Sequence, residues 1–174
     1  MPRFASLIPT GFTLLELLVS MAILGILLGF ALPSFQTLLE RMALSASVQK
    51  FNAHLALARN SAIMRNQRVT LVRLSSTDWS QGWVLFTDAN HNAVQDIGEN
   101  LLAQGEPSGS TRIYGNGQMA QYVSFDALGQ PVQLNGAFLA GTMLFCTQHN
   151  YAQTLVMSRT GRVRLDKSPT KPCP

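Results

Sequence analysis

Residues 12–32 read FTLLELLVSMAILGILLGFAL, and this stretch decides the fold of the N-terminal part of the chain. It contains one ionisable side chain, that of Glu16. An α-helix of about 20 apolar residues spans roughly 30 Å, the thickness of the hydrocarbon core of a bilayer. The stretch therefore predicts a helix that spans a membrane or is buried to a similar degree in an assembly.

The composition of the whole chain agrees with one globular domain that carries an apolar appendage. Of the 174 residues, 47% are hydrophobic and 13% are charged, and the net charge is +4. Charged residues make up about 25% of an average soluble domain, and the apolar segment accounts for the deficit. A chain with this much apolar content is not intrinsically disordered.

The pattern after Pro33 is still helical. Proline inside a helix removes a hydrogen bond, so we expect a bend there. Beyond it, apolar residues recur at alternating spacings of four and three, which is typical of a helix that packs one face on a domain. These residues are Leu44, Val48, Phe51, Leu55, Ala58 and Ala62. We predict one helix that runs to Met64 or Asn66, with residues 12–33 in the membrane or filament core and residues 34–66 amphipathic.

Residues 67–174 are predicted to form a β-rich head. Short β-prone runs alternate with Gly, Asn, Pro and Ser clusters, as in antiparallel strands joined by hairpins. The runs are not separated by helical patterns of the length that parallel β-α-β units need. The fold class is therefore α+β, with a long N-terminal helix packed on a small antiparallel head. The predicted strands are residues 69–74, 83–86, 122–125, 143–147, 154–158 and 162–165.

The junction before the apolar run resembles the type III signal of type IV prepilins and type II secretion pseudopilins. Gly11 precedes the run and Phe12 begins it, whereas an ordinary secretory signal places its cleavage site after the apolar stretch. The resemblance implies that a prepilin peptidase removes residues 1–11 and methylates Phe12. It also implies a single span of the inner membrane with the head in the periplasm, followed by assembly into a filament.

Glu16 is a functional candidate because an acid within an apolar membrane segment is costly unless it is paired. The resemblance implies that Glu16 meets the free N-terminal amine of a neighbouring pilin and sets the axial register. The alternative is a plain signal anchor whose Glu16 lies at the headgroup level. The leader carries Arg3 as its single basic residue, where such leaders usually have more.

Within the head, the resemblance narrows to the FimT and GspH group of minor pilins and pseudopilins. It is carried by residues 58–62 (ARNSA), 82–88 (GWVLFTD) and 158–164 (SRTGRVR). The resemblance implies the type IV pilin fold, other pilins and minor pilins as partners, and a place in the filament or at its tip on the cell surface. It implies no enzymatic activity and no cofactor.

Catalytic and metal-binding motifs are not evident in the sequence. The histidines His54, His91 and His149 lack metal-ligand spacing, and we expect them on the surface or in loops. Oxygen-bearing residues in 88–99 follow the spacing of an EF-hand calcium loop, but Ala93 stands where that loop needs glycine. A hairpin loop explains the same residues, and we predict no metal.

Cys146 and Cys173 are the only cysteines. Both belong to the part that lies outside the inner membrane, where disulfides persist. We predict that they pair, with two free thiols as the alternative. A bridge of this span contributes on the order of 3–4 kcal/mol in the chain-entropy model, and it agrees with the way in which pilins commonly fix their C-terminal region.

Residues 158–164 also form the sharpest functional candidate. If Gly161 makes a turn, Arg162 and Arg164 lie on one face of a strand about 6.7 Å apart, which suits two phosphates. The resemblance extends to the GRxR pattern, which looks like the DNA-binding element of FimT-type minor pilins involved in natural transformation. The remaining candidate residues are Arg159, Lys167 and Lys171. The alternative is that arginines protect an exposed strand edge from aggregation.

The basic C-terminal segment, residues 158–174, favours a polyanionic partner such as nucleic acid or acidic lipid, with a solvated tail as the alternative. Tyr151 is the only aromatic residue near it in the sequence, so we predict sequence-independent binding through the DNA backbone. If the tail is not the site, Arg65 and Arg68 are the next candidates. The rival hypotheses are a GspH-like pseudopilin of a type II secretion system and a minor pilin that only primes pilus assembly.

Overall fold

The computed structural model describes residues 12–166 and 173, and for residues 30–33 the backbone alone. The leader with Gly11, and the basic residues Lys167 and Lys171, lie outside the described residues. The chain divides into two compact units, Met1–Leu38 and Leu39–Pro174. We refer to the second unit as the head and describe each unit by itself.

Helix α1 extends from Leu14 to Arg65. At its start, the Oγ1 atom of Thr13 accepts the backbone N–H of Glu16 at 3.3 Å, as an N-cap residue does. At its end, Asn66 adopts a left-handed φ of 49°. The N–H of Gln67 donates to the carbonyl of Ala62 at 3.2 Å, which satisfies an orphan carbonyl of the last turn. The predicted end of the helix is confirmed.

The part of α1 in the first unit is apolar on all sides. An 18-residue window of the helix has a mean hydropathy of 2.4, which by length and composition is enough to cross a membrane. The exposed apolar side chains include Leu14, Leu17, Leu18, Ile23 and Leu24. The backbone stays helical through Pro33, and the bend expected there remains a prediction.

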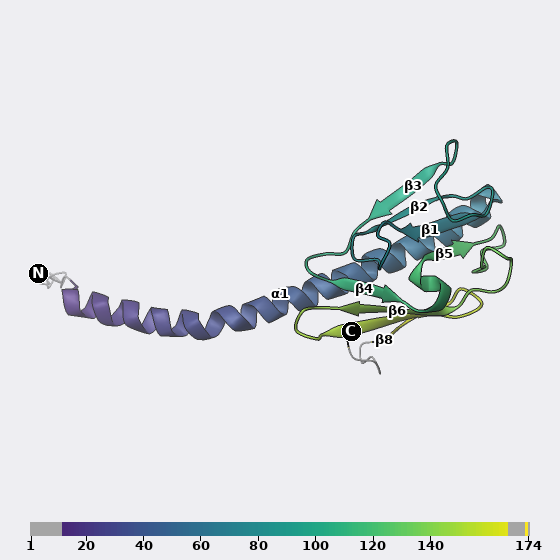
Figure 1. Cartoon of the computed structure of the whole chain (residues 1–174). Coiled ribbons are helices and arrows are strands. Elements are labelled where there is room, and N and C mark those ends of the chain that lie inside the picture. Colours follow the sequence, from purple (N-terminus) through teal and green to yellow (C-terminus); the bar gives the residue numbers. More distant parts are fainter. Residues whose placement is uncertain (1–11, 167–172, 174) are drawn as a thin grey trace, which may run out of the picture. The chain divides into compact units, whose positions relative to one another are not determined.

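The head contains two antiparallel four-stranded sheets (Figure 1). The first has the order β3 (Leu101–Gly105), β2 (Trp83–Thr87), β1 (Val69–Arg73), β5 (Tyr122–Phe125). The second has the order β4 (Arg112–Gly115), β6 (Gly141–Cys146), β7 (Ala152–Met157), β8 (Val163–Asp166). A short 3-10 helix, η1 (Gly117–Ala120), precedes β5. The predicted α+β class is confirmed.

The sequence located six of these strands and missed the other two, β3 and β4. Both missed strands lie at the edge of a sheet. β3 reads LLAQG and has no β-branched residue, whereas β4 reads RIYG and is too short to show the alternation that marks a strand. Pairing with β2 and β6, rather than local preference, makes these segments extended.

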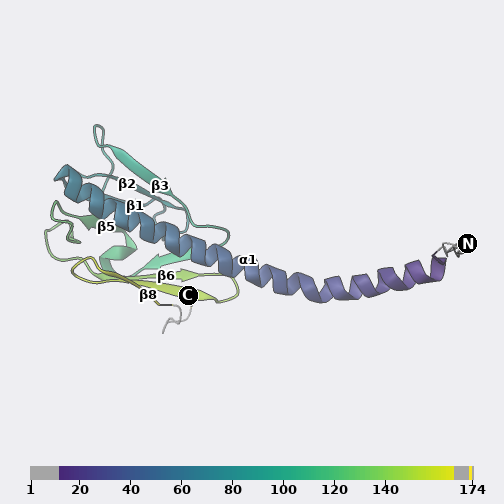
Figure 2. The same ribbon diagram turned by 180° about the vertical axis from the view of Figure 1, so that it is seen from behind.

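The C-terminal half of α1 lies across the sheets, as the view from behind shows (Figure 2). The predicted apolar stripe of the helix is buried in one cluster with residues of both sheets. Phe51 packs edge-on against Trp79, Trp83 and Phe145, at centroid distances of 5.0–5.7 Å. The core residues lie between Leu44 and Met157, so the head contains its own core.

Residues 126–139 cover the outer edge of β5, and we call them the covering segment. Isolated bridges join Phe125 to Pro131 and Val132 to Phe138. The segment also packs on α1, because a Cβ atom at Gly129 would lie 2.6 Å from Cδ1 of Ile63. The covering segment thus connects the first sheet to the last turns of α1.

Candidate functional site

The β7–β8 hairpin is closed by the turn that the sequence predicted at Gly161. The N–H of Gly161 donates to the carbonyl of Ser158 at 2.9 Å, and the N–H of Ser158 donates to the carbonyl of Arg162 at 2.9 Å. Gly161 has a φ of 76°, a conformation that residues with a side chain rarely adopt. The turn therefore requires glycine at this position.

Arg162 and Arg164 are both exposed, on either side of the half-buried Val163. Val163 packs against the core, so the two arginines face away from it by the alternation of an extended chain. Arg164 lies in the edge strand β8 and Arg162 directly precedes it. In the described part of the chain, neither guanidinium group makes a hydrogen bond or an ion pair.

Arg159 has an aromatic neighbour that the sequence did not reveal. Its Cζ atom lies 3.9 Å from the ring centroid of Phe138, in the covering segment. Tyr151, the aromatic residue near this segment in the sequence, is not the one that contacts Arg159. Tyr151 lies just before β7, at the end of that strand opposite the turn. The Cζ atom of Arg41 lies 4.2 Å from the centroid of its ring.

The second candidate pair, Arg65 and Arg68, does not form a joint basic surface. Arg65 is exposed at the end of α1, but Arg68 is only 9% exposed. An Nη atom of Arg68 donates to the carbonyl of Gln133 at 3.4 Å, and its buried Nε atom has no partner among the residues that the structure describes. Arg68 precedes the buried Val69 at the start of β1. The covering segment packs over the side chain of Arg68.

Residues 88–99 form the loop between the paired strands β2 and β3, as the hairpin interpretation predicted. The two carboxylate oxygens of the buried Asp88 accept the N–H groups of Asn92 and Ala93 at 3.0 and 3.1 Å. Ala93 has a φ of 56°, so it takes the left-handed conformation without being glycine. Among the described residues, no group of three or more His, Cys, Asp or Glu side chains is arranged to hold a metal ion.

Amide hydrogen bonds also engage the other two acids of this loop. The carboxylate of Asp96 accepts the side-chain amides of Asn90 and Asn92, both at 2.8 Å. These hydrogen bonds lower the pKa of Asp96. Glu99 accepts the N–H groups of Ala89 and Asp96 at 2.8 and 3.0 Å. The loop's own donors therefore satisfy the oxygens that a calcium ion would need.

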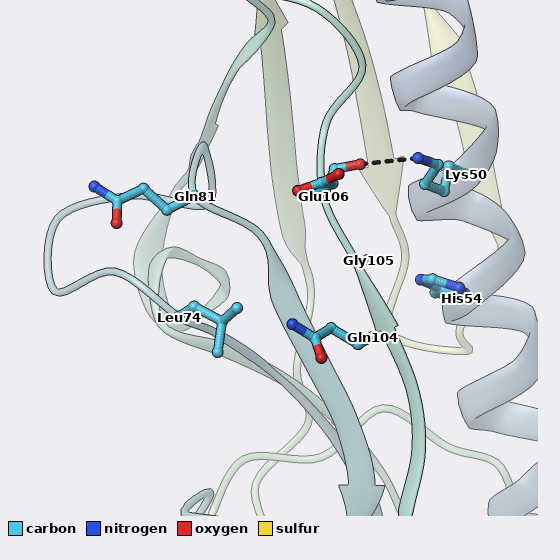
Figure 3. A pocket seen from close by; sticks show the side chains of 7 residues that line it. All are labelled: Lys50, His54, Leu74, Gln81, Gln104, Gly105 and Glu106. Atoms are coloured by element: carbon cyan, nitrogen blue, oxygen red, sulfur yellow. Dashed lines mark hydrogen bonds between the residues drawn. The ribbon is translucent and has the colours of Figure 1, made fainter.

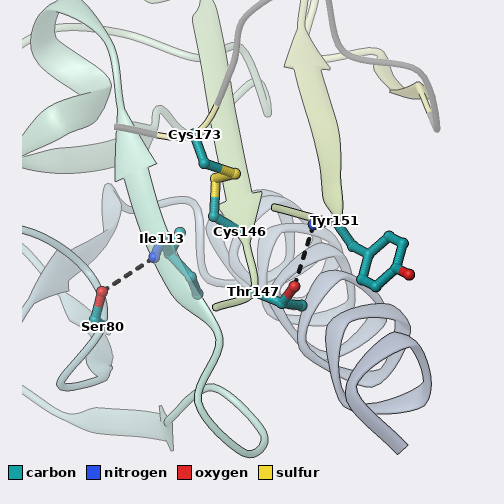
Figure 4. Close-up of a disulfide and its surroundings, with 6 residues drawn as sticks. All are labelled: Ser80, Ile113, Cys146, Thr147, Tyr151 and Cys173. Carbon is teal, nitrogen blue, oxygen red and sulfur yellow. Dashed lines mark hydrogen bonds between the residues drawn. A yellow bond between two sulfur atoms is a disulfide. The ribbon is translucent and has the colours of Figure 1, made fainter. Parts of the chain in front are cut away.

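The predicted disulfide between Cys146 and Cys173 is present, with the two Cα atoms 5.9 Å apart (Figure 4). Cys146 is the last residue of β6, an interior strand of its sheet. In the hairpin that follows β6, the N–H of Tyr151 donates to Oγ1 of Thr147 at 3.2 Å. The bridge thus fastens the C-terminal end of the chain to an interior strand.

A cavity of about 540 Å³ opens between α1 and the ends of β2 and β3 (Figure 3). Its lining residues are Lys50, His54, Leu74, Gln81, Gln104, Gly105 and Glu106. The Nε1 atom of Trp83 donates to Nδ1 of His54 at 2.7 Å. Burial, and then the charge of Lys50, lower the pKa of His54. The lining offers no nucleophile paired with a base, and His54 instead holds a core tryptophan in place.

The expectation that the histidines are surface or loop residues is wrong for His54, which is half-buried on α1. It holds for the exposed His91 and His149. His149 also contacts α1, because its Nδ1 atom lies 2.8 Å from a carboxylate oxygen of Glu40. Neither contact could be inferred from the sequence, since the partners are far apart along the chain.

Comparison with known proteins identifies the family. Residues 47–161 match the family described as type II transport protein GspH, and residues 10–32 match the prokaryotic N-terminal methylation motif. The chain belongs to the GspH family of pilin-like proteins. The second match covers the junction around Gly11 and Phe12 and confirms its resemblance to a prepilin signal.

Other GspH-type and pilin-like proteins share the sequence or the fold. The pilin-like protein PilA1 of Thermus thermophilus is 32% identical over 157 residues, which cover 90% of this chain and 97% of the relative. The type IV minor pilin FimU of Pseudomonas aeruginosa superposes with a TM-score of 0.56 and 20% identity, over 74% of this chain and 96% of that chain. The minor pseudopilin EpsH of the type 2 secretion system of Vibrio cholerae gives a TM-score of 0.50 and 14% identity, over 71% and 95%.

Membership of the GspH family sets the general role of the protein. It is a minor pilin or pseudopilin of the type IV pilus or type II secretion type. Proteins of this family and fold are structural pilins that associate with other pilins in filaments, and they are not enzymes. The apolar N-terminal half of α1, together with the methylation motif, indicates membrane anchoring before assembly.

Proposed function

We propose that this protein is a FimT-like minor pilin of a type IV pilus that binds DNA without sequence preference during DNA uptake. The observation that carries the proposal is the pair of exposed arginines, Arg162 and Arg164, on the β7–β8 hairpin. Acidic partners for either guanidinium group are absent from the described part of the chain. The pair therefore remains available to an external anion.

The chemistry of the two side chains favours phosphate. A guanidinium group presents a planar fork of donors that matches two phosphate oxygens at once. Side chains two residues apart on a strand lie about 6.7 Å from each other, close to the spacing of successive phosphates along a nucleic acid strand. Contacts of this kind fix the position of a duplex and carry no sequence information.

Additional cations of the proposed DNA site lie beside this pair. Arg159 is exposed two residues before Gly161, and its guanidinium group is held over the ring of Phe138. Lys167 and Lys171, which are outside the described residues, add two positive charges to the same end of the chain. Basic charge gathered in this way steers a polyanion toward the site.

The N-terminal residues carry the rest of the proposal. A prepilin peptidase cuts after Gly11 and methylates Phe12, and the resulting protein spans the inner membrane once with its head in the periplasm. In the filament, the carboxylate of Glu16 pairs with the N-terminal amine of a neighbouring pilin and sets the axial register. A membrane acid without such a partner would be costly.

A second candidate function is that of a GspH-like minor pseudopilin in a type II secretion system. The match of residues 47–161 to the family described as type II transport protein GspH favours it. In that case the arginines of the hairpin protect β8, which is an edge strand, against unwanted pairing. A minor pilin that only primes pilus assembly would use them in the same way.

The experiment that tests the proposal measures binding of the head, residues 39–174, to duplex DNA of unrelated sequences over a range of salt concentrations. The variant Arg162→Gln with Arg164→Gln should bind all sequences more weakly. It should also flatten the slope of log affinity against log salt by about two, since each lost phosphate contact contributes roughly 0.9. Arg112→Gln is the matched control, because Arg112 is exposed on β4, at the other edge of the same sheet.

Two outcomes would count against DNA binding at the hairpin. If the double variant binds like the wild type at moderate salt, the arginines serve edge protection. If the wild-type head does not bind DNA, the pseudopilin becomes the better assignment. Deletion of the gene would then impair protein secretion and leave transformation unchanged.

A further inference from the structure

The hairpin arginines have a cationic neighbour on helix α1. A Cβ atom at Gly161 would lie 3.6 Å from both Cζ and Nη1 of Arg59, and 3.3 Å from Cδ of Pro131. The guanidinium group of Arg59 therefore lies directly against the turn that precedes Arg162. The two distances to Arg59 are ordinary van der Waals distances, so the arginine packs on the turn, and glycine is needed at position 161 for the turn itself.

We propose that Arg59 is a third phosphate-binding residue, which forms one DNA site with Arg162 and Arg164. This inference rests on the proposed function and extends the site from the hairpin onto helix α1. A bound DNA backbone would then contact both the end of the helix and the edge of the second sheet. The chemical class of the ligand is the phosphodiester backbone.

The side chain of Arg59 is held in place, while its charged end is unpaired. A Cβ atom at Gly129 would lie 3.2 Å from Cγ of Arg59, so the aliphatic part of the side chain packs on the covering segment. The side chain is half-buried. Throughout the described part of the chain, its guanidinium group has no hydrogen bond and no ion pair. A stem that is already ordered by packing loses little entropy when its charged fork binds.

Within the described residues, the covering segment does not neutralise the charge of Arg59. Asp126 is the only acid in the covering segment. Its Oδ1 atom accepts the N–H groups of Leu128 and Gln130 at 3.0 and 2.8 Å. The carboxylate of Asp126 thus accepts hydrogen bonds within its own turn and does not pair with an arginine in the described part of the chain. The positive potential of Arg59 adds to that of the hairpin.

The two basic residues that follow Arg59 do not take part in this site. Arg65 comes six residues later, which places it about 240° around the helix from Arg59. Arg68 is buried and is engaged by the carbonyl of Gln133. Arg65 is therefore a matched control, since it has the same charge, lies on the same helix and is exposed on a different side.

The test compares five forms of the head in the salt-dependent DNA binding assay: wild type, Arg59→Gln, Arg59→Lys, Arg65→Gln and Arg162→Gln. We expect Arg59→Gln and Arg162→Gln each to reduce the magnitude of the log affinity against log salt slope by about 0.9. Arg65→Gln should keep the wild-type slope. Arg59→Lys should keep the slope but bind more weakly, because an ammonium group retains the charge without the planar fork.

The outcomes separate this inference from the proposed function. If Arg59→Gln keeps the wild-type slope while Arg162→Gln loses its contact, Arg59 is not part of the site and the proposed function stands. Equal losses in Arg59→Gln and Arg65→Gln would indicate a general effect of helix charge and would also overturn the inference. If the wild type itself does not bind DNA, both fail together. Retention of the slope by Arg59→Lys excludes a mere folding defect as the cause of the loss in Arg59→Gln.

Discussion

The two halves of α1, Leu14 to Leu38 and Leu39 to Arg65, differ in where they place their apolar residues. Leaving aside residues 30–33, the apolar side chains described between Leu14 and Leu38 are exposed, as at Leu24, which is 51% exposed. From Leu39 to Arg65 they recur on one side, and Phe51 is fully buried. The first half therefore offers apolar surface that a membrane or other subunits can cover, whereas one side of the second half is buried within the head.

The comparison predicts that residues of the second half determine the stability of the head. Phe51→Ala removes the ring that contacts two tryptophans and Phe145. We expect a loss of about 3–5 kcal/mol in the free energy of unfolding, from lost burial and the cavity left behind. Denaturant unfolding of the head measures this loss. A loss below 1 kcal/mol would mean that Phe51 is not central to the core.

A change in the first half of α1 should affect assembly and leave the stability of the head unchanged. Glu16→Val in the full chain should leave the thermal unfolding of the head unchanged and should allow membrane insertion, because it removes a costly charge from an apolar segment. It should lower incorporation into filaments, measured as the amount of this protein in sheared filaments relative to the membrane fraction. Equal incorporation of the variant and the wild type would show that the carboxylate does not set the register.

The disulfide gives a smaller effect that is again confined to the head. Reduction of the bridge between Cys146 and Cys173 should cost about 2–4 kcal/mol and lower the melting temperature by several degrees. The variant Cys146→Ser with Cys173→Ser should melt at a lower temperature and should no longer respond to the reductant. A thiol titration that detects two free cysteines in the oxidised protein would contradict the bridge.

The pH dependence of the head is the smallest effect that we predict. Because burial and Lys50 lower the pKa of His54 from its ordinary value of 6.5, the unfolded chain takes up a proton more readily than the head does. Stability should therefore fall as the pH drops through 6.5 and level off below the folded-state value. His54→Gln, which keeps an acceptor for Trp83, should flatten this dependence, whereas the exposed loop variant His91→Gln should leave it unchanged. Equal pH profiles for all three forms would contradict the role of His54.

The parts of the fold that could be predicted are those in which the local pattern and the tertiary structure agree. The alternating spacing in α1 and the left-handed tendency of Asn66 mark the helix and its end. β1 and β5 contain β-branched and aromatic residues and were located from the sequence. β3 and β4 depend on pairing with partners that are distant in the sequence, and local preference carries no information about such pairing.

The residues of the candidate site also divide into those that are close in the sequence, which could be predicted, and those that only the fold brings together. Gly161, Arg162 and Arg164 lie within four residues of one another, so turn chemistry and strand alternation were enough to bring them together. Arg59 and Phe138 reach the hairpin from other segments, and a single sequence holds no signal for those contacts. The burial of Arg68 had no such signal either, because alternation in β1 places it with the polar Thr70, and the structure buries both faces of this strand.

The disulfide also determines how the head responds to mechanical load. A force applied at the C-terminal end would otherwise peel β8, an edge strand, away from β7, one hydrogen bond after another. The bond from Cys173 to Cys146 carries that force to the end of β6 instead, and β6 is held on both sides, by β4 and β7. To extract an interior strand, many hydrogen bonds must be sheared together. The bridge thus keeps such a force from acting first on β8, the edge strand of the sheet.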